Sequence, residues 1–82
     1  MFKGEIEVRL KEGVDDPEGK NTLKTLNLLG FSEVRAVCTS RKFEILLEGR
    51  SMKEVRERLE KICQRLLANP VIHEYEIKVS KQ

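Results

Sequence analysis

The change of pattern that decides the fold lies in the stretch Cys63-Gln64-Arg65-Leu66-Leu67-Ala68-Asn69-Pro70-Val71-Ile72-His73-Glu74-Tyr75. Its first half continues a series of apolar residues at helical spacing, whereas from Val71 onward apolar and polar residues alternate. Proline lacks an amide hydrogen and disfavours a helical conformation in the residue before it, so Pro70 predicts that the helix ends by Ala68 or Asn69. The stretch therefore predicts a helix, a sharp corner and a strand.

The helix that ends at this corner has the clearest start signal in the chain. Ser51 and Glu54 have the spacing of a capping box, in which side chains and free backbone amides at the start of a helix bond to each other. The apolar residues that follow at helical spacing are Met52, Val55, Leu59, Ile62 and Leu66, with Cys63 and Leu67 widening the stripe. The sequence therefore predicts a helix that begins after Ser51 and buries one face.

The N-terminal half has a similar layout of strand and helix. Residues 2–10 place apolar side chains on one face and charged side chains on the other, which is typical of a strand with one buried face. Asp16 and Pro17 suit the cap and the first position of a helix, and Gly30 suits the position after its end. We expect a strand over Phe2–Leu10 and a helix over Pro17–Leu29.

Two further alternating segments, Glu33–Ser40 and Lys42–Glu48, flank a short polar turn and predict a β-hairpin. The last strand is expected over Val71–Val79. The element order is then βαββαβ, and helices with one apolar face on half-polar strands predict a two-layer sandwich. We expect an α+β fold with a four-stranded, mainly antiparallel sheet and two helices on one face, in a single domain of residues 1–82.

Composition and charge exclude several classes of protein. The 82 residues carry a net charge of only +2, which argues against nucleic acid as the main partner. No apolar run approaches the roughly 20 residues of a membrane span, and the N-terminus lacks the apolar core of a signal peptide. The two cysteines, Cys38 and Cys63, are far apart without nearby histidines, which indicates buried free thiols in a cytoplasmic protein and no metal site.

Three positions are the strongest candidates for chemistry. His73, the single histidine, falls on the inward face of the last strand with no nucleophile or carboxylate beside it in the sequence, so packing is favoured over catalysis. Cys63 lies on an apolar helical stripe, which also favours packing. Gly19 is unfavourable in the first turn of a helix and indicates either close approach of another backbone or subunit, or an anion held with Lys20; capping with close packing is the favoured interpretation.

Three apolar residues, Val37, Leu46 and Ile72, are expected on the polar far face of the sheet. Scattered apolar residues on such a face are common. If their strands are neighbours, however, the three side chains form a patch suited to contact between subunits. Both interpretations remain open at this point.

Three blocks of the sequence together resemble the PurS family. The first is Leu10-Lys11-Glu12-Gly13-Val14-Asp15-Asp16-Pro17-Glu18-Gly19-Lys20, the second is Leu28-Leu29-Gly30-Phe31 followed by Val34 and Val37, and the third is Cys63–Tyr75. The blocks follow in the same order and at the same spacing as in the family and span nearly the whole chain. Lys11, Asp16, Pro17, Gly19, Asn69 and Pro70 match the signature and are candidates for docking a partner or shaping the fold.

The resemblance implies the small subunit of phosphoribosylformylglycinamidine (FGAM) synthase, an enzyme of de novo purine synthesis. That enzyme converts formylglycinamide ribonucleotide, glutamine and ATP into FGAM, glutamate, ADP and phosphate. The implied role is to bridge a glutaminase subunit and a larger synthase subunit and to assist ammonia transfer, without a catalytic site in this chain. The resemblance also implies a cytoplasmic homodimer. The chain itself is expected to bind no cofactor, whereas the complex uses ATP and Mg.

Two other hypotheses remain from the residues alone. One is a small-molecule-binding regulatory domain of similar βαββαβ architecture. The other is a small enzyme that uses His73. Binding of RNA is disfavoured, because RNA-binding domains of this strand order stack bases on aromatic side chains, and strand 42–48 offers only Phe43.

Overall fold

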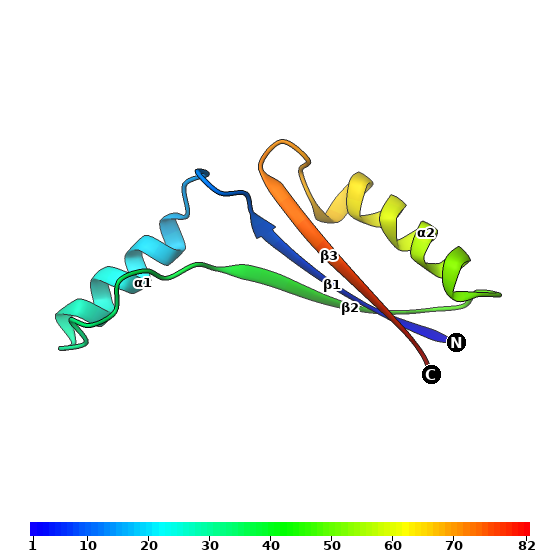
Figure 1. The fold of residues 1–82 in the computed structure, drawn as a ribbon, viewed down its shortest axis with the longest axis horizontal. Helices are drawn as coiled ribbons and strands as arrows, with labels where there is room; N and C mark the ends of the chain where they lie inside the picture. Colours follow the sequence, from blue (N-terminus) through cyan, green and yellow to red (C-terminus); the bar gives the residue numbers. More distant parts are fainter.

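The computed structural model describes all residues from 1 to 82 and contains three strands and two α-helices. In chain order the elements are β1 (Phe2–Leu10), α1 (Pro17–Leu28), β2 (Ser40–Leu47), α2 (Met52–Ile62), the π-helical turn η1 (Cys63–Leu67) and β3 (His73–Lys81). The molecule is elongated, with extents of 51 × 27 × 14 Å. One end holds the sheet and α2, and α1 projects from the other (Figure 1).

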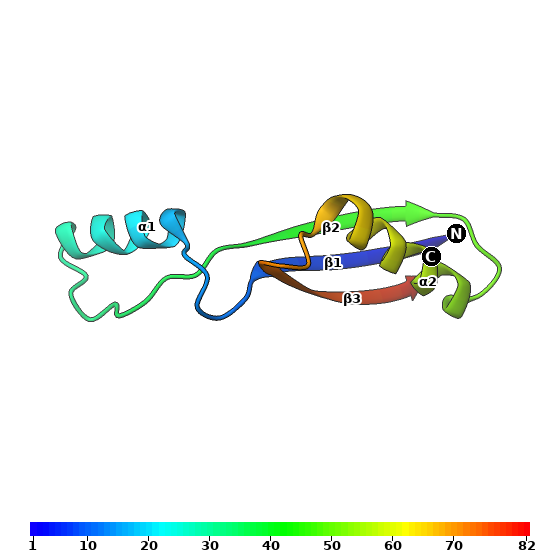
Figure 2. The same ribbon diagram turned by 90° about the horizontal axis from the view of Figure 1, so that it is seen from above.

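The sheet is antiparallel and has β1 in the centre, in the order β2-β1-β3 (Figure 2). Ile6 of β1 lies opposite Phe43 of β2 and Ile77 of β3, so the apolar faces of all three strands coincide. An α+β fold with an antiparallel sheet is therefore confirmed.

The prediction of a fourth strand is wrong for the single chain. Residues 33–39 pair with no strand, and residues 39–41 do not turn back but lead straight into β2, which begins at Ser40. Alternation of side chains indicates extended backbone and does not choose between a hairpin and one long extended segment. Here the straight path is fixed by Thr39, whose amide donates a hydrogen bond of 2.8 Å to the Asp16 side chain before α1.

The core lies between the sheet and α2. Ile6, Val55, Leu59 and Cys63 are completely buried there. Gly4 lets α2 approach β1 closely, because a Cβ at this position would lie 2.5 Å from Leu59 Cδ1. The helix packs mainly against β3 and β1, and Phe43, Ile45 and Leu47 of β2 lie at the margin of this core.

The predicted corner after α2 is confirmed. The π-helical turn closes with a hydrogen bond of 2.9 Å from the Ala68 amide to the Cys63 carbonyl, and Ala68 is already extended. The strand β3 starts at His73, not Val71, because the amides of Ile72 and His73 both donate to the Asn69 carbonyl and hold the intervening residues in a turn.

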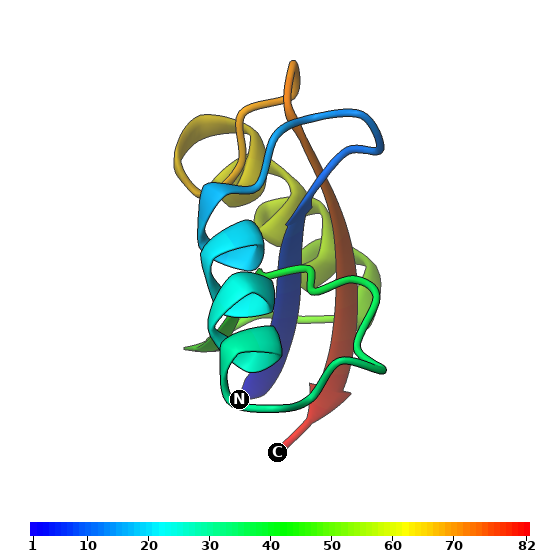
Figure 3. The same cartoon turned by 90° about the vertical axis from the view of Figure 1, so that its left-hand side faces the viewer.

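The arm, which we define as residues 17–39, consists of α1 and the extended segment that returns beside it (Figure 3). The Gly30 position was predicted correctly: its φ is 101°, and the Phe31 amide donates to the Leu26 carbonyl as in a Schellman ending. The end of the arm is apolar and exposed, since 79% of Leu28, 68% of Leu29 and 49% of Phe31 is accessible. The predicted position of α1 over the sheet is therefore wrong for the single chain.

No helix of the structure has the length and apolar character needed to cross a membrane.

Candidate functional site

The signature residues lie at the end of the sheet where the arm begins, in two groups. The first group surrounds the corner. The ammonium of Lys11, just after β1, donates to the Pro70 carbonyl at 2.6 Å, and the Lys11 amide donates to the Ile72 carbonyl at 2.8 Å. Residues from the first and last blocks of the sequence, Lys11 and Pro70, are thus in direct contact. The Pro70 residue is exposed.

Asn69 organises the corner through its own side chain and its amide. Its Oδ1 accepts a hydrogen bond of 2.9 Å from the Val71 amide, an Asx turn of the kind that asparagine favours. Its amide donates to Nδ1 of His73 at 2.8 Å. Nδ1 therefore serves as the acceptor of this hydrogen bond. The structure thus gives His73 a hydrogen-bonding role in the turn.

The second group is the Asp16 clamp, defined by Asp16, Gly19 and Thr39. One carboxylate oxygen accepts the Gly19 amide at 2.9 Å, and the other accepts the Thr39 amide at 2.8 Å and the Thr39 hydroxyl at 3.0 Å. The hydrogen bonds from Gly19 and Thr39 lower the pKa of Asp16. The clamp joins the start of α1 to the start of β2 and fixes the direction of the arm. Asp16 was predicted as a helix cap, but Thr39 carried no sequence signal that would have identified it.

The clamp predicts acid sensitivity that depends on Asp16. Folding lowers the pKa of Asp16. Its ionised form therefore stabilises the folded chain in full at pH values above the pKa of an unfolded aspartate, about 3.9. This contribution is lost as the pH falls through the lower pKa of the folded state. We expect Asp16→Asn to be less stable than the native chain at neutral pH, and the difference to shrink below about pH 4.

Urea unfolding at several pH values measures this difference. The matched control is Asp15→Asn, because Asp15 contacts only Lys20 on the surface. A stability difference for Asp16→Asn that stays constant through the acid range would contradict the clamp.

Gly19 is required by close approach of another segment of the same chain. It is buried, and a Cβ at this position would collide with the Val37 carbonyl oxygen and lie 2.9 Å from Asp16 Oδ2. Of the two explanations considered from the sequence, the structure supports capping with close packing. Lys20 instead pairs with Asp15. Pro17 occupies the first turn of α1 and is exposed.

A groove of about 530 Å³ lies between the two groups, on the face of the sheet that carries α2. Its lining comes from β1, the start of α1, the start of β2, η1 and β3, and includes Val8, Leu10, Asp16, Arg41, Leu67 and His73. The charged lining has both signs, and no carboxylate bonds to His73. The hydrogen bonds of Lys11, Asp16 and Asn69 beside this groove hold segments of backbone together.

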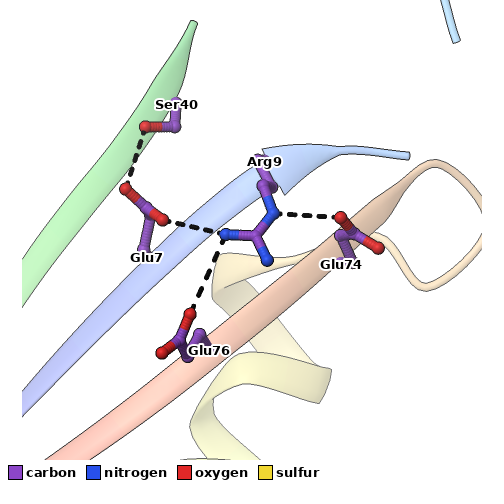
Figure 4. Close-up of polar contacts among 5 residues, drawn as sticks. All are labelled: Glu7, Arg9, Ser40, Glu74 and Glu76. Atoms are coloured by element: carbon purple, nitrogen blue, oxygen red, sulfur yellow. Dashed lines mark hydrogen bonds and ion pairs between the residues drawn. The ribbon is translucent and has the colours of Figure 1, made fainter. Parts of the chain in front are cut away.

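The opposite face of the sheet is charged and open to solvent. Arg9 lies among three carboxylates, with Nε 2.9 Å from Glu74, Nη1 2.9 Å from Glu7, and Glu76 at 4.0 Å (Figure 4). The bond to Glu74 raises the pKa of the Arg9 guanidinium. Glu7 and Glu76 stand directly opposite each other in the register, and Arg9 offsets their repulsion. The positive charge of Arg9 thus explains how β1 and β3 remain paired although their exposed face is rich in acidic residues.

The three apolar residues considered as a patch are separated in the single chain. Leu46 lies opposite Lys3 of β1, whereas Ile72 bonds to Lys11, which follows β1. Lys3 and Lys11 are eight residues apart, or roughly 26 Å at the rise of an extended strand. Leu46 is 63% exposed on the charged face. Val37 is half-buried in the arm.

The two cysteines differ in environment. Cys63 is buried in the core, and burial raises the pKa of its thiol, which fits the predicted packing role. Cys38 is exposed on the arm, so the prediction that it is buried is wrong. The strand expected over Glu33–Ser40, in which Cys38 would have faced inward, does not form in the single chain. Nearby, the Tyr75 hydroxyl donates to Glu60 at 2.6 Å, and this bond together with burial raises the pKa of Tyr75.

Comparison with known proteins identifies a family whose members match this chain. Residues 3–81 match the family described as PurS: Phosphoribosylformylglycinamidine (FGAM) synthase. The phosphoribosylformylglycinamidine synthase subunit PurS of Methanocaldococcus jannaschii is 47% identical over 99% of this chain and 98% of its own length. The crystal structure of PurS from that organism has a TM-score of 0.91, with 45% identity and coverage of 100% and 99% of the two chains.

A chain in the structure of PurLQS from Thermotoga maritima is also similar. It has a TM-score of 0.76 and 30% identity, and the match covers 96% of each chain. The relationship therefore extends along the whole length of both chains and includes a member seen in a complex.

Proposed function

We propose that this chain, which belongs to the PurS family and is the small subunit of an FGAM synthase of purine biosynthesis, bridges the glutaminase and synthase subunits of that enzyme. In this role it assists the transfer of ammonia from glutamine to the nucleotide substrate and catalyses no step itself. The observation that carries the proposal is the full-length match to a chain of the PurLQS structure. The same matches favour the subunit over a regulatory domain that binds a small molecule.

The residues of the chain fit a bridging role. The polar side chains of the two signature groups form hydrogen bonds within turns and at the helix cap. Asn69 and Asp16 accept such bonds from backbone amides. Two exposed surfaces remain for partners: the apolar end of the arm, and the corner with Pro70 and the 77%-exposed Val71. Lys11, Asp16, Pro17, Gly19, Asn69 and Pro70 then act by shaping and presenting these surfaces.

The remaining parts of the proposal concern the assembled enzyme. The chain works in the cytoplasm as a homodimer within the complex. It binds no cofactor of its own, and the ATP and Mg used by the complex are held by the synthase subunit. A homodimer suits a chain that buries only ten of its 82 residues and leaves large apolar side chains exposed.

Subunit mixing tests the bridge directly. The purified glutaminase and synthase subunits are combined with and without this chain, and the masses of the resulting species are measured by size-exclusion chromatography with light scattering. We expect the two large subunits to co-elute only when the chain is present. Co-elution of the large subunits in its absence, with no change on its addition, would overturn the proposal.

Loss of the only histidine should leave the function intact. In His73→Ala the Asn69 amide loses its acceptor, but this amide is exposed and can bond to water. We therefore expect His73→Ala to support glutamine-dependent FGAM synthesis at the native rate in the reconstituted complex. A rate reduced to that of the complex without the chain would support a catalytic role and contradict the proposal.

A further inference from the structure

The strand β3 has an open edge. It lies at one side of the sheet and pairs with β1 alone (Figure 2). The pairing is continuous along all nine residues of β3, from His73 to Lys81, and the strand contains neither a proline nor a bulge. Native proteins usually interrupt or cover an edge of this length, because its free backbone groups can pair with another strand.

The register shows which backbone groups of β3 face outward. The Lys11 amide donates to the Ile72 carbonyl, and the Gln82 amide donates to the Met1 carbonyl. In an antiparallel pair, residues that bond to the neighbouring strand alternate with residues that face away from it. The amides and carbonyls that point to the open edge are therefore those of residues 73, 75, 77, 79 and 81.

One side chain covers this edge. Nη1 of Arg56, in α2, donates a hydrogen bond of 3.2 Å to the carbonyl of Ile77, which is one of the outward-facing groups. Ile77 is also the middle residue of β3. A strand that paired at this point would displace a charged guanidinium from its hydrogen bond and take it out of water, which is unfavourable.

The strand that suits this edge best is a second copy of β3. If two copies run antiparallel about an axis at Ile77, Glu76 of one copy lies opposite Lys78 of the other, and Tyr75 lies opposite Val79. Opposite charges then face each other on the outer side of the sheet, and apolar residues on the side of α2. Moving the axis by one residue places Glu76 or Lys78 opposite its own copy. The complementary register therefore has its centre at the carbonyl that Arg56 covers.

We propose that Arg56 blocks the open edge of β3 against pairing with the β3 of a second copy. The block lies at the centre of the complementary register, so loss of this one donor makes the whole edge available. The inference requires neither the bridging role nor the homodimer proposed above. In a homodimer, a second two-fold contact of this kind joins dimers into an open-ended series, which is unsuitable for a subunit of an enzyme with a defined composition.

Removal of the guanidinium tests the block. We expect Arg56→Ala to associate, so that its mass by light scattering rises to about twice that of the native chain at about 1 mM, a concentration suited to a small interface. Arg58→Ala is the matched control, because Arg58 is an exposed arginine of the same helix without a hydrogen bond to β3, and it should keep the native mass. Circular dichroism checks that both variants retain the native helix content. A folded Arg56→Ala protein with the native mass would overturn the proposal.

Reversal of the charge at position 78 tests the register. Addition of Lys78→Glu to Arg56→Ala places glutamates opposite each other, so the mass should return to the native value. A further Glu76→Lys change restores opposite charges and should restore association. The control is Lys53→Glu in the Arg56→Ala background, which makes the same charge change on an exposed residue of α2 and should leave association intact. Association that persists with Lys78→Glu uses another surface and contradicts the proposal.

Amide hydrogen exchange of the native chain provides a test without a substitution. The amides of Tyr75 and Val79 point to the open edge, whereas those of Glu76 and Lys78 bond to β1. We expect the first pair to exchange much faster than the second in the native chain, and to become protected in Arg56→Ala. Equal protection of the two pairs in the native chain would show that the edge is already occupied, and would overturn the block by Arg56.

Discussion

Replacement of Gly19 by alanine is expected to destabilise the protein, although the same change normally stabilises a helix by about 1 kcal/mol. The added Cβ collides with the Val37 carbonyl oxygen and crowds Asp16, so α1 must move away from the returning segment of the arm. Because the clash is with backbone, it cannot be relieved by a rotamer change. We expect a net loss of about 1–3 kcal/mol in the free energy of unfolding, the range for overpacked sites.

Urea unfolding by circular dichroism measures this change, with Asn21→Ala as the matched control. Asn21 is an exposed residue of the same helix, and alanine there should be neutral or slightly stabilising. The opposite signs of the two alanine substitutions are the diagnostic result. A Gly19→Ala protein as stable as Asn21→Ala would show that α1 does not approach Val37 as described.

Truncation of Leu59 should produce the largest loss of stability in the chain. Leu59 is completely buried in α2 and its methyl groups fill the space above Gly4. Leu→Ala substitutions in protein cores cost about 2–5 kcal/mol, because both the transfer energy and the cavity contribute. For a domain whose total stability is about 5–15 kcal/mol, such a loss leaves a substantial unfolded population at moderate denaturant concentration.

The control for Leu59→Ala is Val71→Ala, which shortens an apolar side chain that is 77% exposed. Surface changes of this kind alter stability by no more than about 0.5 kcal/mol. Thermal or urea unfolding of both variants compares the two sites. Equal stability of the two variants would contradict the position of Leu59 at the centre of the core.

The sequence predicts correctly those helix ends that carry a residue with a specific capping or helix-ending role. Ser51 accepts the Glu54 amide at 3.2 Å, as the capping box requires, and Gly30 ends α1 with a positive φ. Pro70 ended the second helix at the predicted place. In each case a single residue type satisfies a local backbone requirement, so the signal does not depend on the rest of the fold.

The path of residues 33–48 could not be predicted from the same kind of signal. Their alternation is equally compatible with a hairpin and with a straight segment, and the difference depends on contacts between Thr39 and Asp16 that are distant in sequence. The sequence identifies the signature residues as a group. The contact of Lys11 with Pro70 could not be predicted from it, because the two residues are distant in sequence and only the fold brings them together. The exposed position of Cys38 follows from the same straight path.

In the proposed function, the chain is a non-catalytic subunit needed for ammonia transfer in FGAM synthase. The most direct measurement compares the rates of FGAM synthesis from glutamine and from added ammonium, in complexes reconstituted with and without this chain. We predict that without this chain glutamine no longer supports FGAM synthesis, whereas added ammonium still does. An unchanged ratio of the two rates without the chain would contradict the claim.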